Sequence, residues 1–206
     1  MNKRIYVIDN KKYPSVTTVT NILASPGMLY FYGKYGTEKA EHIGRQAAII
    51  GKKLHKAIKR DSIGKKCWPK KYSNILNNIL KQYIRFKIKY NYKSKHSELT
   101  VSSKKHNYAG TLDNIGKINK DKVMIDWKTS SKIYPEYILQ IAAYYFAYKE
   151  MNPKYKSKRI WIVRFKKDNW TKTLPEIRKL KFKEIRKAYK TFLHLLYVYQ
   201  WISKYR

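Results

Sequence analysis

The sequence predicts an α/β fold of the α+β type, in which a central mixed and mostly antiparallel sheet is flanked by helices. Three observations carry this prediction: helical periodicity over residues 37–90, three strand-like runs over residues 97–130, and two helical patterns around one further strand after residue 134. The 206 residues suffice for one hydrophobic core and are short for two. We expect one domain, because no repeat and no Gly-, Ser- or Pro-rich linker divides the chain.

Residues 1–92 are expected to be mainly helical. Residues 3–8 alternate like a short strand, "NKKYP" at 10–14 turns the chain, and "SVTTVTNILA" at 15–24 predicts a short helix. A longer helix is predicted over residues 37–59, ending near "KRDSIG". A second amphipathic helix is predicted over residues 72–90, with six side chains facing inward: Ile75, Leu76, Ile79, Leu80, Tyr83 and Phe86.

Residues 93–166 are expected to form the sheet and one covering helix. The strand-like runs are "SELTVSS", "YAGTLDNIGKI" and "KVMIDWKTS", separated by the polar turns "KKHN" and "NKDK". Pro135 suits a first helical position, and "EYILQIAAYYFAYKEM" after it is helical in pattern. "KRIWIVRF" predicts a further strand, and residues 175–204 predict a long terminal helix within the last part of the chain, 167–206.

The charge of the chain indicates a polyanionic partner. Lys and Arg number 47 against 13 Asp and Glu, which gives a net charge of +34. A compact body with this charge repels itself unless a polyanion or counterions lie nearby, and nucleic acid is the obvious polyanion. The joint enrichment of Lys, Tyr, Ile and Asn also fits an AT-rich genome, but that bias does not explain the scarcity of acids. The 43% hydrophobic content is too high for a disordered tail.

Cysteine content and hydropathy exclude several classes of protein. The single cysteine, Cys67, cannot build a disulfide framework, a zinc knuckle or a four-cysteine iron–sulfur cluster within one chain. The first residues show no sustained apolar stretch or cleavage site of a signal peptide. The most apolar window, residues 192–202, is too short to span a bilayer. We therefore expect a soluble protein of the cell interior with no membrane partner.

Four polar side chains are predicted to share one face of the sheet. If both connecting turns contain four residues, Asp113 lies opposite Lys128 across the second hairpin and opposite Glu98 across the first. Side chains two apart on a strand share a face, so Asp126 lies beside Lys128. Trp127 and Leu112 then point to the other face, into the core. A turn with an odd number of residues would scatter this row.

Carboxylates gathered on one face favour a bound cation. They do not all stay ionised cheaply without one, and oxygen ligands suit Mg²⁺ or Mn²⁺. The alternative is that these acids form ordinary salt bridges with some of the 47 basic side chains. The spacing alone leaves both readings open.

Three short segments in and after these strands indicate what the row of polar side chains does. "GTLD" at 110–113, "IDWKTS" at 125–130 and "QIAAY" at 140–144 resemble, in that order, the motifs of the PD-(D/E)XK nuclease superfamily. In its RecB-like branch they correspond to G-x-x-D, D-x-K and Q-x-x-x-Y. "GKKLH" at 51–55 is similar to the helix that carries a metal-binding histidine in that branch. "YPSVTTVTNIL" at 13–23 is similar to the "PSVT" segment of phage exonucleases and of the mitochondrial genome maintenance exonuclease.

The resemblance implies a restriction-endonuclease-like core and a role for each matching residue. His55, Asp113, Asp126 and the main-chain carbonyl of Trp127 would hold one or two Mg²⁺ or Mn²⁺ ions. Lys128 would orient or help deprotonate the attacking water and neutralise charge near the phosphate. Gln140 and Tyr144 would brace the site or contact DNA. Glu98 would lie next to the metal ligands without contacting the ion itself. The hydroxyls of Ser15, Thr17 and Thr18 would contact a DNA end.

The implied activity is that of a metal-dependent deoxyribonuclease. We expect an exonuclease on single-stranded DNA or duplex ends, serving phage or bacterial recombination, repair or replication in the cytoplasm of a bacterial or phage-infected host cell, alongside viral, replication or recombination proteins. The subgroup with an iron–sulfur cluster is excluded, because its four cysteines are missing. Two alternatives stay open: an inactive nuclease-like module that binds nucleic acid in a virion or ribonucleoprotein assembly, and a basic protein that only packs nucleic acid. Cleavage polarity and the choice between exonuclease and flap endonuclease also stay open.

Overall fold

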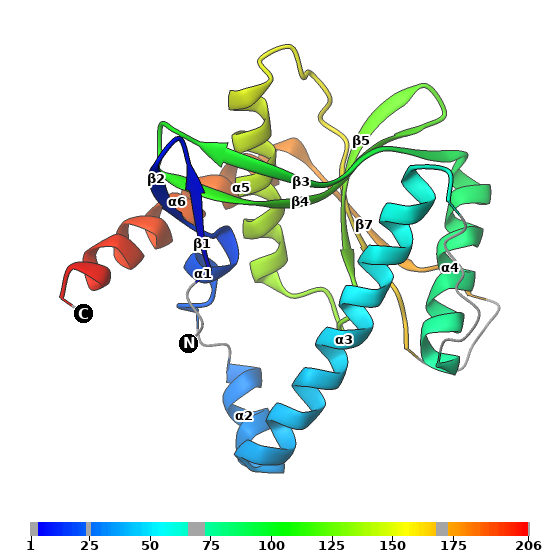
Figure 1. Cartoon of the computed structure of the whole chain (residues 1–206), viewed down its shortest axis with the longest axis horizontal. Coiled ribbons are helices and arrows are strands. Elements are labelled where there is room, and N and C mark those ends of the chain that lie inside the picture. Colours follow the sequence, from blue (N-terminus) through cyan, green and yellow to red (C-terminus); the bar gives the residue numbers. More distant parts are fainter. Residues whose placement is uncertain (1–3, 24–25, 66–72, 168–172, 206) are drawn as a thin grey trace.

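The computed structural model describes residues 4–23, 26–65, 73–167 and 173–205 (Figure 1). Cys67, the first residue of the predicted 72–90 helix and the first residue of the predicted N-terminal strand lie outside these ranges. In chain order the elements are β1 Ile5–Ile8, β2 Lys11–Pro14, α1 Val16–Thr20, α2 Pro26–Tyr35, α3 Thr37–Ser62, α4 Asn74–Tyr90, β3 Tyr92–Ser103, β4 Tyr108–Ile118, β5 Asp121–Lys128, α5 Pro135–Met151, β6 Ile160–Arg164, β7 Glu176–Leu180 and α6 Phe182–Lys204.

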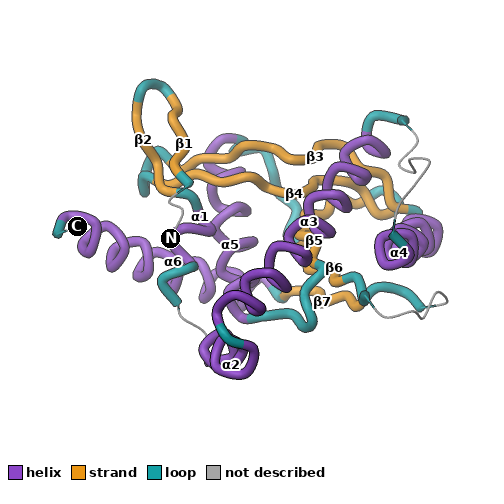
Figure 2. Tube along the Cα trace, turned by 60° about the horizontal axis from the view of Figure 1, so that its bottom comes forward, coloured by secondary structure: helices purple, strands orange, loops and turns teal. Residues whose placement is uncertain are grey.

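The predicted fold class is confirmed. A five-stranded sheet has the order β3-β4-β5-β6-β7, and β1 and β2 form a separate two-stranded sheet. The pairs β3/β4, β4/β5 and β6/β7 are antiparallel, whereas β5 and β6 run parallel. A parallel pair needs a crossover, and α5 provides it between β5 and β6. The sheet is therefore mixed and mostly antiparallel, with helices on both faces (Figure 2).

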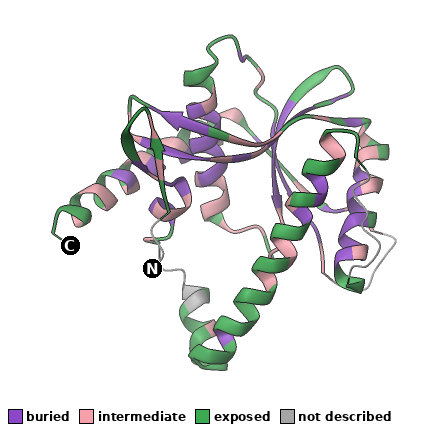
Figure 3. Ribbon diagram, in the orientation of Figure 1, coloured by how far each residue is buried: buried purple, intermediate pink, exposed green. Residues whose placement is uncertain are grey.

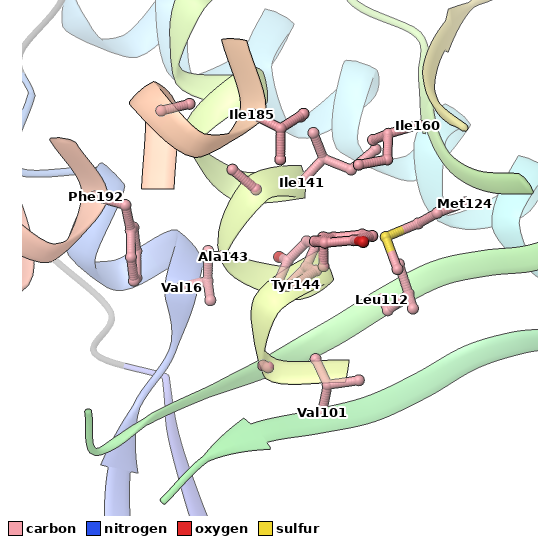
Figure 4. Close-up of a cluster of buried hydrophobic side chains, with 14 of the residues drawn as sticks. Val16, Val101, Leu112, Met124, Ile141, Ala143, Tyr144, Ile160, Ile185 and Phe192 are labelled. Carbon is pink, nitrogen blue, oxygen red and sulfur yellow. The ribbon is translucent and has the colours of Figure 1, made fainter. Parts of the chain in front are cut away.

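Each face of the sheet carries its own hydrophobic cluster. On one face, strand residues such as Met124 and Ile160 pack against α5, α6 and α1, and Figure 4 shows Leu112 and Val101 pointing toward Ile141 and Tyr144 of α5. The other cluster joins α3 and α4 to the strands. Its centre is Trp127, which packs against the rings of Tyr83, Phe86, Tyr92 and Phe165. Buried side chains line the sheet and the inner helix faces, whereas α2 and the start of α3 are exposed (Figure 3).

Three local predictions differ from the structure. Residues 175–204 are not one helix, because Glu176–Leu180 form β7 and pair with β6 before α6 begins. Residues 10–14 are not only a turn: Asp9 and Asn10 adopt positive φ angles of 49° and 60°, and Lys11–Pro14 return as β2. The helix α2 was not predicted. In the first two cases a strand partner elsewhere decides the local structure, as it commonly does for short charged strands.

The predicted register holds in the first hairpin and shifts by two residues in the second. Ser103 pairs with Tyr108 around a four-residue turn, as predicted. The second turn contains two residues, because Ile118 pairs with Asp121. The pairs of β4 and β5 run from Ile118 with Asp121 to Asn114 with Ile125, so the predicted pairing of Asp113 with Lys128 does not form. A shift of two residues by itself preserves the alternation of faces.

One predicted face is wrong. Trp127 and Leu112 are both buried, but Trp127 lies in the α3/α4 cluster and Leu112 in the α5/α6 cluster. The regular alternation of the β3/β4 pair is interrupted at Glu98, whose φ is 56°. The paired residues on either side are Ser97 with Asn114 and Leu99 with Leu112, so Glu98 and Asp113 are both left out of the ladder and the two strands are irregular at this point. This interruption also sets Glu98 beside Asp113 at the edge of the site described next.

Among the described residues, no helix has both the length and the apolar character required to cross a membrane.

Candidate metal and nucleic-acid site

A cavity of about 480 Å³ lies between α3, the strands β3–β5 and the start of α5. The residues that line it include most of those predicted from the sequence: Thr17, His55, Glu98, Asp113, Asp126, Lys128, Gln140 and Tyr144. The chain thus brings together side chains from six elements that are up to 127 positions apart in sequence. Each side chain has a local reason for its position.

His55 connects the helix α3 to the strands. Its Nδ1 atom lies 2.8 Å from Glu98 Oε1 and 3.7 Å from Asp113 Oδ1. The neighbours Leu54 and Ile58 are buried against α4, so the apolar face of α3 anchors the helix and presents His55 to the sheet. His55, Glu98 and Asp113 each offer a ligand atom, and these three atoms lie within 4.8 Å of one another.

Asp113 is held by the neighbouring strand. Its Oδ2 atom accepts a hydrogen bond of 2.8 Å from the backbone N–H of Trp127. The aromatic cluster around Trp127 fixes that stretch of β5 and therefore fixes the carboxylate. Oδ1 is left facing His55. Asp113 is accordingly the residue that ties the strand β5 to the imidazole of α3.

Asp126, which is buried, forms an ion pair with the partly buried Lys128 beside this group. Lys128 Nζ lies 2.8 Å from Asp126 Oδ2 and donates a hydrogen bond of 3.0 Å to Oδ1. Burial raises the pKa of the Asp126 carboxyl group, and the ammonium of Lys128 opposes that rise. Burial would lower the pKa of Lys128, but Asp126 and Asp113 outweigh it and raise the pKa above its ordinary value. The two carboxylates therefore favour the charged form of Lys128.

Gln140 orients Lys128. Its Oε1 atom accepts from Lys128 Nζ at 3.4 Å, and its Nε2 atom donates to Thr20 Oγ1 at 3.2 Å. Because α5 begins at Pro135, the first turns of the helix carry Gln140 directly over the end of β5. The amide thus links the ammonium to α1.

The carboxylates govern the charge of His55. Burial alone would lower the pKa of His55, but Asp113 and Glu98 outweigh burial and raise it to about 9. The hydrogen bond from His55 in turn lowers the pKa of Glu98. In the absence of a bound cation, the protonated imidazole neutralises part of the negative charge of the two acids.

Tyr144 forms part of the core beneath the cavity. It is 5% exposed, and burial raises its pKa well above the ordinary value. A Cβ atom on Gly110 would lie only 2.4 Å from the Tyr144 ring, so the glycine permits the close approach of β4 and α5. The ring therefore has a packing role, and any contact with DNA stays a prediction.

The three predicted hydroxyl residues occupy different positions. Ser15 is buried, and its Oγ caps α1 by accepting from the Thr18 N–H at 2.9 Å, so it does not line the cavity. Thr18 Oγ1 lies 2.7 Å from Ser15 Oγ. Thr17 alone of the three lines the cavity. The "PSVT" segment is thus mainly a helix cap in this protein.

The structure groups the predicted acids differently from the expectation, and their roles as metal ligands stay predictions. Glu98, expected behind the ligands, belongs to the three-residue group with His55 and Asp113. Asp126, expected as a ligand, lies outside that group and pairs with Lys128. The Trp127 carbonyl stays a predicted ligand. The left-handed backbone at Glu98, inside a strand, has no pattern in the sequence.

The cationic lining was also missed. Arg4, Lys52, Lys56 and Lys59 line the same cavity. The three lysines recur on α3 at helical spacing around His55, which places them on one face. That spacing was the available clue, although 47 basic residues made it hard to separate from the background.

Comparisons with known proteins assign the chain to no family. No protein-family model and no curated protein sequence matches the chain. Among solved structures, one described as the crystal structure of SSO0001 is similar over 86% of this chain and 74% of that chain, at 15% sequence identity and a TM-score of 0.37. A likeness at this level supports no inference about the site. The chemistry of the site is therefore argued from the residues themselves.

Proposed function

We propose that the protein is a divalent-metal-dependent deoxyribonuclease, acting as an exonuclease on single-stranded DNA or duplex ends. One observation carries the proposal: an imidazole and two carboxylates converge within 4.8 Å beside a partly buried lysine ammonium, in a cavity lined by four further cations. The ordered resemblance of the motifs at residues 51–55, 110–113, 125–130 and 140–144 to PD-(D/E)XK nucleases supports the same activity.

The donor set fits a divalent cation. Two carboxylates and one imidazole suit Mg²⁺ or Mn²⁺, and the histidine shifts the preference toward Mn²⁺. His55, Glu98 and Asp113 would hold the ion, with Asp126 next to them. A bound divalent ion polarises a phosphate oxygen and lowers the pKa of a bound water.

The other residues of the cavity stabilise charge and position the substrate. Lys128 places a fixed positive charge where negative charge develops on a phosphate under attack. Asp126 and Gln140 hold that ammonium in place, so it needs no reorganisation. Arg4, Lys52 and Lys56 line the approach and attract the sugar-phosphate backbone. A strand of DNA drawn into the cavity would thus meet the metal ligands and Lys128 together.

A cleavage assay with a matched pair of variants tests the proposal. End-labelled single-stranded and blunt duplex DNA would be incubated with Mn²⁺, with Mg²⁺ and with EDTA. We expect cutting with both ions, faster with Mn²⁺, and none with EDTA. Asp113→Asn should bind DNA but not cut it, whereas Asp121→Asn, at the exposed surface turn of β5, should behave as the wild type.

Two outcomes would contradict the proposal that the protein is a nuclease. Cutting that persists in Asp113→Asn would remove the proposed metal site. DNA binding without any cutting at any metal concentration would favour the inactive binding module. Labelling the 5′ and the 3′ end in separate reactions also shows which end is attacked.

A further inference from the structure

A second cavity of about 370 Å³ lies against the first. The two share a wall formed by Gly51, His55, Lys128 and Gln140. Beyond this wall, the second cavity is bounded by α3, by the loop that follows β5, by α5 and by Lys167 after β6. Three of the four residues in this wall, His55, Lys128 and Gln140, belong to the proposed catalytic site.

The second cavity has the opposite charge character to the first. No carboxylate lines it among the described residues, whereas Glu98, Asp113 and Asp126 line the first. Lys128 and Lys167 both face it. Lys167 is partly buried, and no hydrogen bond or ion pair links it to another described residue. Lys128 is already paired with Asp126, so Lys167 is the ammonium available to an anion such as a phosphate group, and no acid of the described lining competes for it.

The space exists because α3 carries small residues here. Ala47, Ala48 and Gly51 are the α3 residues that, with His55, line the cavity. At Gly51 the helix is so close to the loop after β5 that a Cβ atom would lie 3.6 Å from Thr129 Oγ1. Larger side chains on this part of α3 would fill the cavity. Tyr137 supplies an aromatic wall, with Lys128 Nζ 4.6 Å from its ring centroid.

The loop that closes the cavity is held in place before any ligand arrives. Arg164 donates to the carbonyl oxygens of Ser130 at 3.2 Å and Ser131 at 2.8 Å, and its Nη2 pairs with Glu176 at 2.5 Å. The loop follows β5, whose carboxyl end lies beside that of the parallel strand β6. Crevices at the carboxyl ends of parallel strands are common ligand sites, and preformed ones lose little affinity to ordering.

We propose that the second cavity binds one nucleotide unit of the strand, the one adjacent to the phosphate under attack. Its volume is at the small end of ligand sites, which run from about 300 to 1,000 Å³, and so suits one nucleotide rather than two. Lys167 binds the phosphate, and Tyr137 with the small face of α3 encloses the base and sugar. The product released is then a mononucleotide. The identity of the ligand rests on the proposed nuclease function.

Binding of thymidine 5′-monophosphate in EDTA tests the cavity without metal or catalysis. By calorimetry on the full chain, we expect the wild type to bind the nucleotide and Ala47→Leu to bind it at least tenfold more weakly, because leucine fills the space. Gln46→Leu, one position earlier on an exposed face of α3, is the matched control and should bind as the wild type. Lys167→Gln should weaken binding of the nucleotide but not that of thymidine, which lacks the phosphate.

Product analysis separates this proposal from the nuclease itself. With metal, we expect the first products from end-labelled DNA to be mononucleotides. A protein that cuts DNA but releases longer fragments first, or binds the nucleotide equally in Ala47→Leu and Lys167→Gln, would overturn the nucleotide site and leave the nuclease standing. A protein that shows the expected binding pattern but never cuts would overturn the nuclease and support the site as a nucleotide-binding cavity.

Discussion

The two cavities share one wall but differ in what they can hold. The first gathers the carboxylates of Glu98, Asp113 and Asp126 around His55, and the second contains none. All three acids come from strands β3–β5, and their side chains face the first cavity only. Lys128 and His55 line both. A single row of strand side chains can therefore create a cation site on one side and leave an anion site on the other.

This difference assigns separate roles to the two sides. Metal affinity should depend on the first cavity, and nucleotide affinity without metal on the second. Lys128 belongs to both because its ammonium pairs with Asp126 on one side and lies over the Tyr137 ring on the other. Variants in one cavity alone, and variants in the shared wall, test whether metal binding and nucleotide binding are separate.

The largest effect is expected from His55→Ala, on the metal side. The substitution removes a proposed ligand and leaves Glu98 and Asp113 as two close acids, so metal affinity and kcat should each fall by about a hundredfold or more. Metal titration followed by calorimetry would measure the first, and a cleavage assay the second. His42→Ala, an exposed histidine on the same helix, is the control and should change neither. Unchanged metal affinity in His55→Ala would remove the imidazole from the site.

Lys128→Gln changes the shared wall and should have the next largest effect. The glutamine side chain retains a donor for Asp126 but not the positive charge, so kcat should fall by about 10² to 10³. Binding of thymidine 5′-monophosphate in EDTA should weaken as well, because the ammonium faces both cavities. Both are measurable on one preparation. If kcat falls but nucleotide affinity is unchanged, the Lys128 ammonium does not contribute to binding in the second cavity.

Gln140→Leu should have a moderate effect on both activity and stability. Lys128 loses an orienting acceptor and Thr20 a donor, so we expect kcat to fall about tenfold and the free energy of unfolding to drop by about 1–3 kcal/mol. Denaturant unfolding and the cleavage assay measure the two. Gln140→Glu, which keeps an acceptor for Lys128, should retain more activity than Gln140→Leu; the reverse order would exclude the orienting role.

The smallest effect is expected at the cationic lining of the first cavity. Lys52→Gln should weaken DNA binding severalfold at low salt and reduce the slope of log affinity against log salt by about one. Lys53→Gln, an exposed neighbour that does not line the cavity, is the control for a general loss of charge. Equal losses of DNA affinity in the two variants would mean that a lysine lining the cavity binds DNA phosphates no more strongly than its exposed neighbour.

The sequence anticipated the elements better than their contacts. The helices over 37–62 and 74–90 follow from strong apolar periodicity, whereas that over 135–151 follows from Pro135 at its start. Asp126 and Lys128 share a face because alternation along a strand is local. β7 was mistaken for helix because "EIRKL" is a charged edge strand, and only its pairing with β6 makes it extended. The place of Glu98 depends on a left-handed φ that no periodicity reveals.

The sequence by itself determined the charge, the fold class and the polar face of β5, since composition and periodicity are properties of neighbouring residues. Tertiary structure alone decided that the Asp113 carboxylate accepts from the Trp127 N–H, that Glu98 meets His55, and that small residues of α3 leave a second cavity beside the first. Each of these contacts joins elements far apart in the chain. Turn lengths, helix packing and one irregular backbone angle set such contacts, and these are fixed only when the whole core closes.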